Sequence, residues 1–127
     1  MTTTHKLVIS LAAAACLIGL GAWRRQHTKC EQRRATFEAR LEQIRRDADK
    51  ELVTGTSKER AVAFFNANGL GFYFDASRKE GSGRVDLKTC SPGWYCGDSA
   101  AIGVWTQFDE SAHVKSHKVE AMLTDCL

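Results

Sequence analysis

The most distinct feature of the chain is an uncharged apolar run near the N-terminus. Seventeen residues, Leu7 to Trp23, carry no charge, and Lys6 and Arg24 stand at the two ends. As a helix, this run measures about 26 Å at about 1.5 Å per residue, slightly less than the roughly 30 Å hydrocarbon core of a bilayer. The flanking cations snorkel toward the interface, where Trp23 is also favoured. The pattern predicts a membrane anchor over residues 1–23, with 7–23 in contact with lipid.

Two other interpretations of this run stay open. A cleaved signal peptide would use a small-x-small site at Ala13–Ala15 or Gly19–Gly21. A lipoprotein signal would attach its lipid to Cys16, although the apolar residues Leu17–Leu20 continue the run beyond that cysteine. We favour the uncleaved anchor, in which Cys16 is a small lipid-facing side chain.

Residues 24–53 have the pattern of an amphipathic stalk helix. The segment contains no proline and no glycine, and apolar side chains recur three or four positions apart. The stripe consists of Phe37, Leu41, Ile44, Ala48 and Leu52. We expect it to pack on the chain's own small domain. The alternative is a short parallel coiled coil that forms a homodimer through Phe37, Leu41 and Ile44.

The remainder, residues 54–127, has the pattern of a short helix followed by strands. Thr56 and Glu59 have the spacing of a capping box, so a helix is expected to begin there and to end near Ala67. Strands are expected over 70–74, 84–89, 101–108 and 113–123, with polar turns over 78–83 and 109–112. Helices followed by three or four antiparallel strands indicate an α+β fold.

The order of elements in residues 53–123 resembles that of a group of bacterial envelope proteins. Gly55-Thr56-Ser57 opens a helix with Val62 and Phe65, Gly69 ends it, and a meander reaches Phe108-Asp109 before a turn and a last strand. This arrangement is similar to the small outer-membrane assembly lipoproteins of the SmpA/OmlA type and to the related β-lactamase-inhibitor-protein-like fold. The resemblance implies a two-helix layer over an antiparallel sheet, a location in the cell envelope and a protein-binding role.

Charge is unevenly distributed along the chain. The net charge is +3, to which residues 24–50 contribute +4 and residues 51–127 contribute −2. A nucleic-acid-binding domain would carry its positive charge on the folded part, so we expect no nucleic-acid partner. With 43% hydrophobic residues and a single proline, the composition also excludes a disordered or collagen-like chain.

The side of the membrane on which residues 54–127 lie is predicted differently by two patterns. The basic residues that follow the apolar run favour a cytoplasmic domain under the positive-inside rule. Four cysteines outside the run, in contrast, are typical of an oxidising compartment. We favour a single-pass protein of the inner (plasma) membrane with a periplasmic C-terminal domain, and keep the cytoplasmic domain as the alternative.

The stretch from Cys90 to Cys96 is the most distinctive motif of the domain. Pro92-Gly93 favours a tight turn that brings the two cysteines together, so we expect a disulfide between Cys90 and Cys96. Cys126 bonded to one of these two is the second choice, with Cys30 free or bonded to another chain. A redox-active pair is less consistent with the C-x5-C spacing. Trp94, Tyr95 and Asp98 are candidate partner-binding residues.

The sequence contains no motif that indicates an enzyme or a cofactor site. No P-loop, HExxH, nucleophile elbow or dinucleotide fingerprint is present. His113 and His117 would lie about 13 Å apart on a strand, too far for one metal ion. We therefore expect no enzymatic activity and no cofactor. The predicted function is a membrane-anchored protein-binding module of the cell envelope; the alternatives are an inhibitor or immunity-type protein and a thiol-redox protein.

Overall fold

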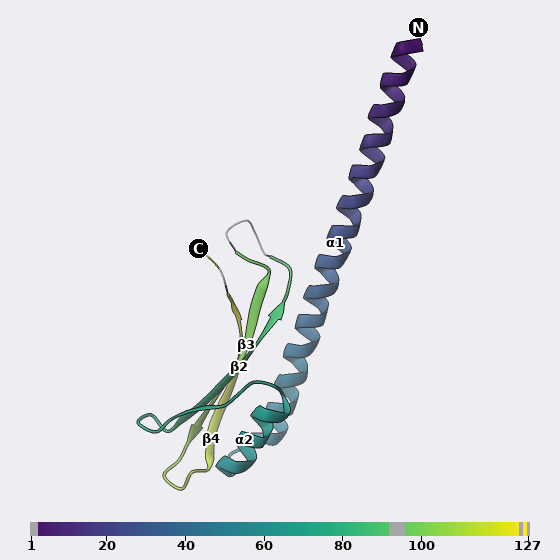
Figure 1. Cartoon of the computed structure of the whole chain (residues 1–127). Helices are drawn as coiled ribbons and strands as arrows, with labels where there is room; N and C mark the ends of the chain where they lie inside the picture. The colour runs from purple at the N-terminus through teal and green to yellow at the C-terminus, as the bar shows by residue number, and fades with distance from the viewer. Residues whose placement is uncertain (1–2, 92–95, 125, 127) are drawn as a thin grey trace. The chain divides into compact units, whose positions relative to one another are not determined.

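A computed structural model describes residues 3–91, 96–124 and 126 of the chain (Figure 1). The chain divides into two compact units, residues 1–32 and Arg33–Leu127. The first unit is the N-terminal part of helix α1 (Thr3–Glu51). This helix is long and apolar enough to cross a membrane, and its apolar window is not buried inside the protein. Leu17 and Ile18, for example, are 71% and 73% exposed.

The second unit begins with the last part of α1 and continues into helix α2 (Lys58–Ala67). Helix α2 ends where the sequence predicts, but its N-cap is Ser57, whose hydroxyl accepts a hydrogen bond from the Arg60 amide at 3.4 Å. The predicted capping box of Thr56 and Glu59 is therefore wrong: the N-cap lies one residue later, and its N3 residue is Arg60 rather than Glu59. The reason is that the Thr56 hydroxyl donates a hydrogen bond to the Glu51 carbonyl at 3.1 Å. This carbonyl lies at the end of α1, where backbone acceptors have no partner within the helix.

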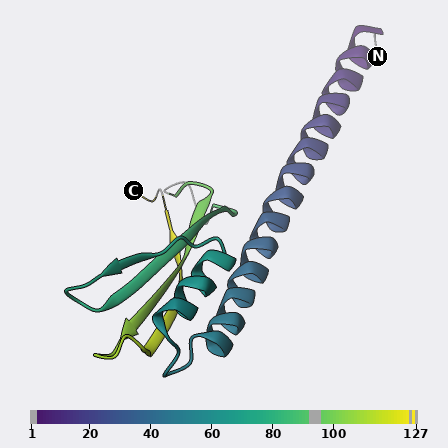
Figure 2. The same cartoon turned by 60° about the horizontal axis from the view of Figure 1, so that its bottom comes forward.

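Four antiparallel strands form one sheet in which neighbours in sequence are neighbours in space (Figure 2). The strands are β1 (Tyr73–Asp75), β2 (Glu80–Lys88), β3 (Ser99–Phe108) and β4 (Val114–Leu123). The two long pairings, β2 with β3 and β3 with β4, continue along nearly the whole length of β3. The predicted α+β arrangement, with an N-terminal apolar helix, a short helix and an antiparallel sheet, is confirmed.

The first two strands differ from their predicted bounds for reasons that involve glycine. Gly69 and Gly71 have φ values of +66° and +65°, so the chain turns twice after α2 and pairs only from Tyr73 onward. Strand β2 begins at Glu80, within the predicted turn, and contains Gly81 and Gly83. A Cβ atom at Gly83 would lie 2.7 Å from the Phe65 ring, so this strand can pass under α2 only with glycine there.

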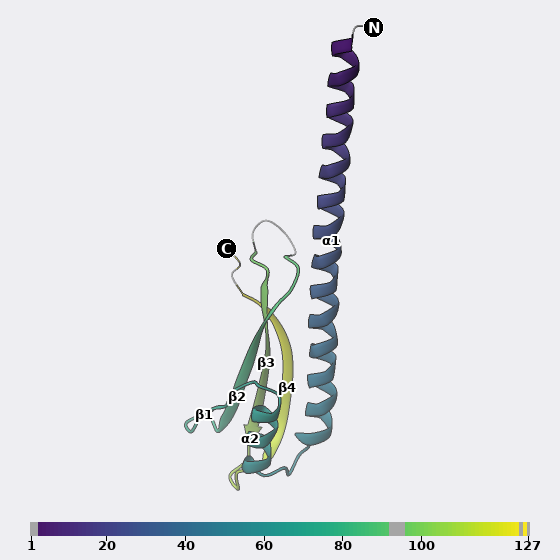
Figure 3. The same ribbon diagram turned by 45° about the vertical axis from the view of Figure 1, so that its right-hand side comes forward.

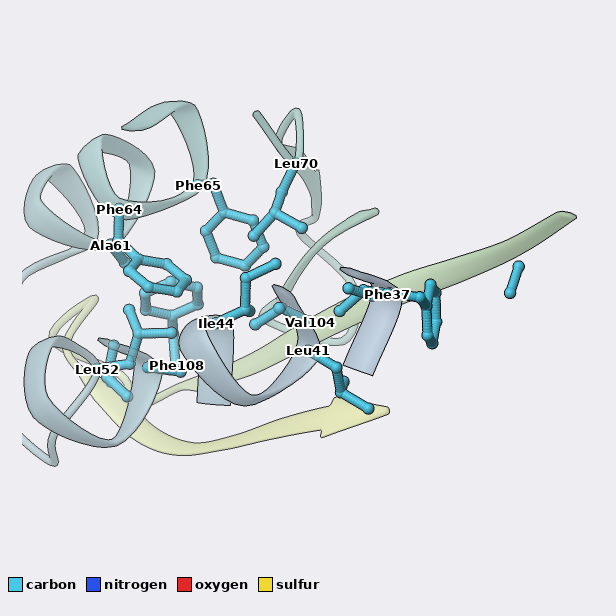
Figure 4. Close-up of a cluster of buried hydrophobic side chains, with 14 residues drawn as sticks. Phe37, Leu41, Ile44, Leu52, Ala61, Phe64, Phe65, Leu70, Val104 and Phe108 are labelled. Carbon is cyan, nitrogen blue, oxygen red and sulfur yellow. The ribbon is translucent and has the colours of Figure 1, made fainter. Parts of the chain in front are cut away.

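The core lies between the sheet and a layer of two helices (Figures 3 and 4). Figure 3 shows α2 and the last turns of α1 beside the sheet. The largest fully buried side chains of these two helices are Ile44, Leu52, Phe64 and Phe65, which meet Ile102 and Val104 of β3. The Phe64 and Phe65 rings pack edge to face with centroids 5.7 Å apart.

The predicted apolar stripe of the stalk belongs to this core. Phe37 and Leu41 are 7% and 9% exposed, and Ile44 is fully buried, all within the second unit. The first of the two predicted arrangements, packing on the chain's own domain, is therefore the one observed. A coiled coil through the same three side chains would need them on the surface, and they are covered by the sheet.

Candidate site on the uncovered face of the sheet

The two faces of the sheet have opposite surroundings. Because side chains alternate along a strand, Ile102 and Val104 point into the core, whereas Gly103 and Trp105 belong to the other face. The cross-strand partners of Trp105 are Ser82 on β2 and Lys118 on β4. No helix among the described residues covers this second face, which we call the open face (Figure 1).

The open face carries a shallow apolar hollow of about 530 Å³. Its larger side chains on this face are Tyr73, Arg84, Trp105 and Met122, and the core residues Leu70 and Phe72 border it. These residues come from β1, the segment before it, and the strands β2, β3 and β4. The meander topology therefore brings together side chains that lie up to about 50 positions apart in the sequence.

Glycine at position 103 determines how the Trp105 ring lies. A Cβ atom at Gly103 would overlap the indole ring of Trp105 and would lie 2.9 Å from the terminal methyl of Met122. The indole therefore lies over the backbone of its own strand and occupies the space that a side chain at position 103 would fill. This packing holds a large aromatic surface flat beside the hollow, with its rotamer fixed by the backbone below it.

Tyr73 completes the hollow on the β1 side and is 69% exposed. Charged side chains around the hollow occur in pairs of opposite sign on the same strand: Arg84 with Asp86 at 3.6 Å, and Lys118 with Glu120. These pairs leave the open face without a strong net charge. Apolar contact, rather than attraction between charges, is what this surface offers to a ligand.

The structure places only one of the three predicted partner-binding residues. Trp94 and Tyr95 lie outside the described residues. The Asp98 carboxylate contacts the Lys88 ammonium at 3.1 Å and the Arg33 guanidinium at 3.5 Å. The hydrogen bond from Lys88 lowers the pKa of Asp98, with a smaller contribution from Arg33. Asp98, which immediately precedes β3, therefore connects β2 with α1, and its charge is already matched within the chain.

The predicted bond between Cys90 and Cys96 is wrong, because Cys96 is bonded to Cys126. Their Cα atoms are 4.0 Å apart, and the two residues form an isolated antiparallel bridge. This bridge lies beyond the last paired residues of β3 and β4 and is shifted by one position from their register. Cys30 is itself disulfide-bonded, so the expectation of a free Cys30 fails. Cys16 is free and exposed.

A contact that sequence reasoning missed joins β4 to the end of α1. The Nδ1 atom of His117 lies 3.0 Å from the carbonyl oxygen of Leu52, and its Nε2 atom lies 2.8 Å from Oδ1 of Asp49. The other histidine of the predicted strand, His113, lies 3.9 Å from Asp109. Within the described ranges, no group of three or more histidine, cysteine or acidic side chains could hold a metal ion.

Comparison with known proteins gives no relative for this chain. No family model matches it, and neither a curated protein nor a solved structure does. The resemblance to outer-membrane assembly lipoproteins therefore stays a prediction, and the open face is the basis of the functional argument.

Proposed function

We propose that this protein is a membrane-anchored, non-enzymatic module of the cell envelope that binds a partner protein through its open face. The observation that carries the proposal is the hollow around Trp105, Tyr73 and Met122 on a sheet face that no described helix covers. Tryptophan, tyrosine and arginine are the side chains that contribute most binding energy in protein interfaces. Three of the larger lining side chains, Trp105, Tyr73 and Arg84, belong to these types.

The form of the surface favours a protein partner over a small substrate. The hollow is shallow and bordered by paired charges, an arrangement typical of an interface with an apolar centre and a polar rim. The described residues that line the hollow include no carboxylate, imidazole or thiol. The hydroxyls that line the hollow, those of Tyr73 and Ser82, have no general base among these lining residues to activate them.

A periplasmic location for the second unit is part of the proposal. Disulfides persist in oxidising compartments and are rare in the cytoplasm, and Cys96 and Cys126 are joined. We expect a reporter enzyme that is active only outside the cytoplasm to be active when fused after Leu127. Activity of a cytoplasm-only reporter at the same position would support the alternative orientation.

Site-specific photo-crosslinking tests the binding face directly. A photoreactive amino acid replaces Tyr73 in the full chain, expressed in its own cells; a second variant carries it at Ser111, in the β3–β4 turn. We expect a discrete protein adduct from position 73 only, and we expect Trp105→Ala to remove it while the domain remains folded by circular dichroism. Equal adducts from both positions, or an adduct unaffected by Trp105→Ala, would contradict the proposed face.

A further inference from the structure

Three exposed cations follow the apolar run on helix α1. Arg24, Arg25 and Lys29 lie on exposed helical surface, and residues 24–30 contain no acidic side chain. We call these three residues the basic collar. Arg25 and Lys29 are four positions apart and therefore share one side of the helix.

The collar lies at the depth of lipid headgroups. The rise from Arg24 to Lys29 is about 7.5 Å at about 1.5 Å per residue. Each headgroup layer of a bilayer is about 5–7.5 Å thick, which is half of the difference between the total and the hydrocarbon thickness. Trp23, immediately before the collar, packs its ring 5.6 Å from that of His27, and aromatic rings of this kind mark the membrane–water interface.

The charges of the collar are not matched within the part of the chain that the structure describes. No ion pair is found there for Arg24, Arg25 or Lys29, and all three are exposed. Later cations of the same helix differ: Arg33 pairs with Asp98, and Arg45 pairs with Glu42 at 2.8 Å. The collar thus presents positive charge without a counterion at the level where phosphates of the bilayer lie.

We propose that the basic collar binds the headgroups of anionic phospholipids. Arginine forms paired hydrogen bonds with phosphate oxygens, and each basic residue near a negatively charged membrane surface strengthens association about fivefold. The proposal rests on the membrane anchoring proposed above. It assigns the collar a ligand of its own, separate from the protein partner of the open face.

The test uses the full chain reconstituted in phosphatidylcholine vesicles that contain trace spin-labelled lipid. Electron spin resonance gives the association constant of labelled phosphatidylglycerol at the protein relative to that of labelled phosphatidylcholine. We expect a ratio of about 5 at low salt, falling toward 1 in 1 M NaCl, where the Debye length is about 3 Å. The variant Arg24→Gln/Arg25→Gln/Lys29→Gln should give a ratio near 1 at both salt concentrations.

A matched control removes the same charge farther along α1. The variant Arg45→Gln/Arg46→Gln/Lys50→Gln should keep the wild-type ratio. A ratio near 1 for the wild type, or an equal fall in both variants, would overturn the collar as a lipid site. Carbonate extraction at high pH is performed on each preparation: protein that leaves the vesicles would refute the anchor and the collar together, whereas retained protein without lipid preference would refute the collar alone.

Discussion

Removing the bond between Cys96 and Cys126 is expected to destabilise the second unit strongly. The bond joins residues separated by 30 positions. In the chain-entropy model, closing a loop of about 30 residues stabilises a protein by about 3.7 kcal/mol at 25 °C, because the unfolded chain loses conformational freedom. The variant Cys96→Ser/Cys126→Ser should therefore unfold with a free energy lower by about 3–4 kcal/mol. Replacing both residues avoids leaving a single reactive thiol.

Urea unfolding of the full chain in mild detergent measures this loss. Tryptophan fluorescence reports on the sheet, because Trp105 lies on β3, and detergent preserves the apolar part of α1. The matched control is Cys16→Ser, which removes a free cysteine and should leave the midpoint unchanged. The loop-length argument would be contradicted if the free energy of unfolding fell by less than about 1 kcal/mol while its dependence on urea concentration stayed unchanged. The bond would then not constrain the unfolded chain as that argument requires.

Peptide mapping without reduction checks the pairing itself. Trypsin leaves Cys90 and Cys96 in one peptide, since no lysine or arginine lies between them. A second cleavage after Trp94 or Tyr95 separates these two cysteines. We expect the peptide that contains Cys96 to be linked to the C-terminal peptide that contains Cys126. A link between Cys96 and Cys90 would refute the structure at this point.

Three further predictions concern the domain. His117→Ala should lower the free energy of unfolding by about 1–3 kcal/mol, because the Leu52 carbonyl and the Asp49 carboxylate lose their partner. Gly83→Val should lower the free energy of unfolding by about 1–3 kcal/mol or more, because its Cβ would overlap the Gly71 carbonyl and the Phe65 ring; urea unfolding measures both. The backbone N–H of His113 lowers the pKa of Asp109, so its carboxylate adds stability above about pH 4 that is lost as the pH falls through the folded-state pKa. Asp109→Asn should therefore lose less stability than wild type on acidification, as thermal unfolding across pH will show.

Neighbouring substitutions are the controls for these three predictions. Lys118→Ala changes an exposed side chain next to His117, and a loss as large as that of His117→Ala would contradict the role of the ring contacts. Gly55→Ala has no atom within 4 Å of the new Cβ, so its cost comes from the positive φ alone. Glu110→Gln changes the residue next to Asp109. If this variant also lost less stability than wild type on acidification, the assignment to Asp109 would be contradicted.

The sequence predicts the helices and the order of the strands because the apolar periodicities are strong. Phe37, Leu41 and Ile44 recur at helical spacing, and this face is the one buried against the sheet. The bounds of β2 were not predictable from the same pattern. Gly81 and Gly83 indicate a turn when only local preferences are considered, whereas in the fold Gly81 lets the Phe72 ring approach and Gly83 lets α2 and the chain after it approach. A close approach between distant segments leaves no local signal.

The proximity of Cys126 to Cys96, although not the exact pairing, was predictable from the sequence. In an antiparallel hairpin, the positions of paired residues add to a nearly constant value, and the predicted turn over 109–112 sets that value. Extending the observed register past Leu123 places Cys126 opposite Gly97, and a shift of one position gives the observed bridge with Cys96. The local Pro92-Gly93 turn outweighed this argument in our prediction. The open face had no comparable signal, since Tyr73, Trp105 and Met122 meet only through the sheet.

The packing of α1 on the sheet has a consequence for how the protein is made. Ile44 is covered by residues such as Val104, which lies about 60 positions later in the chain. At about 5–20 residues per second, ribosomes need about 3–12 s to synthesise that interval. During this time the apolar stripe of α1 has been made, but the strands that cover it have not. Early synthesis is therefore the period in which this chain most needs a chaperone.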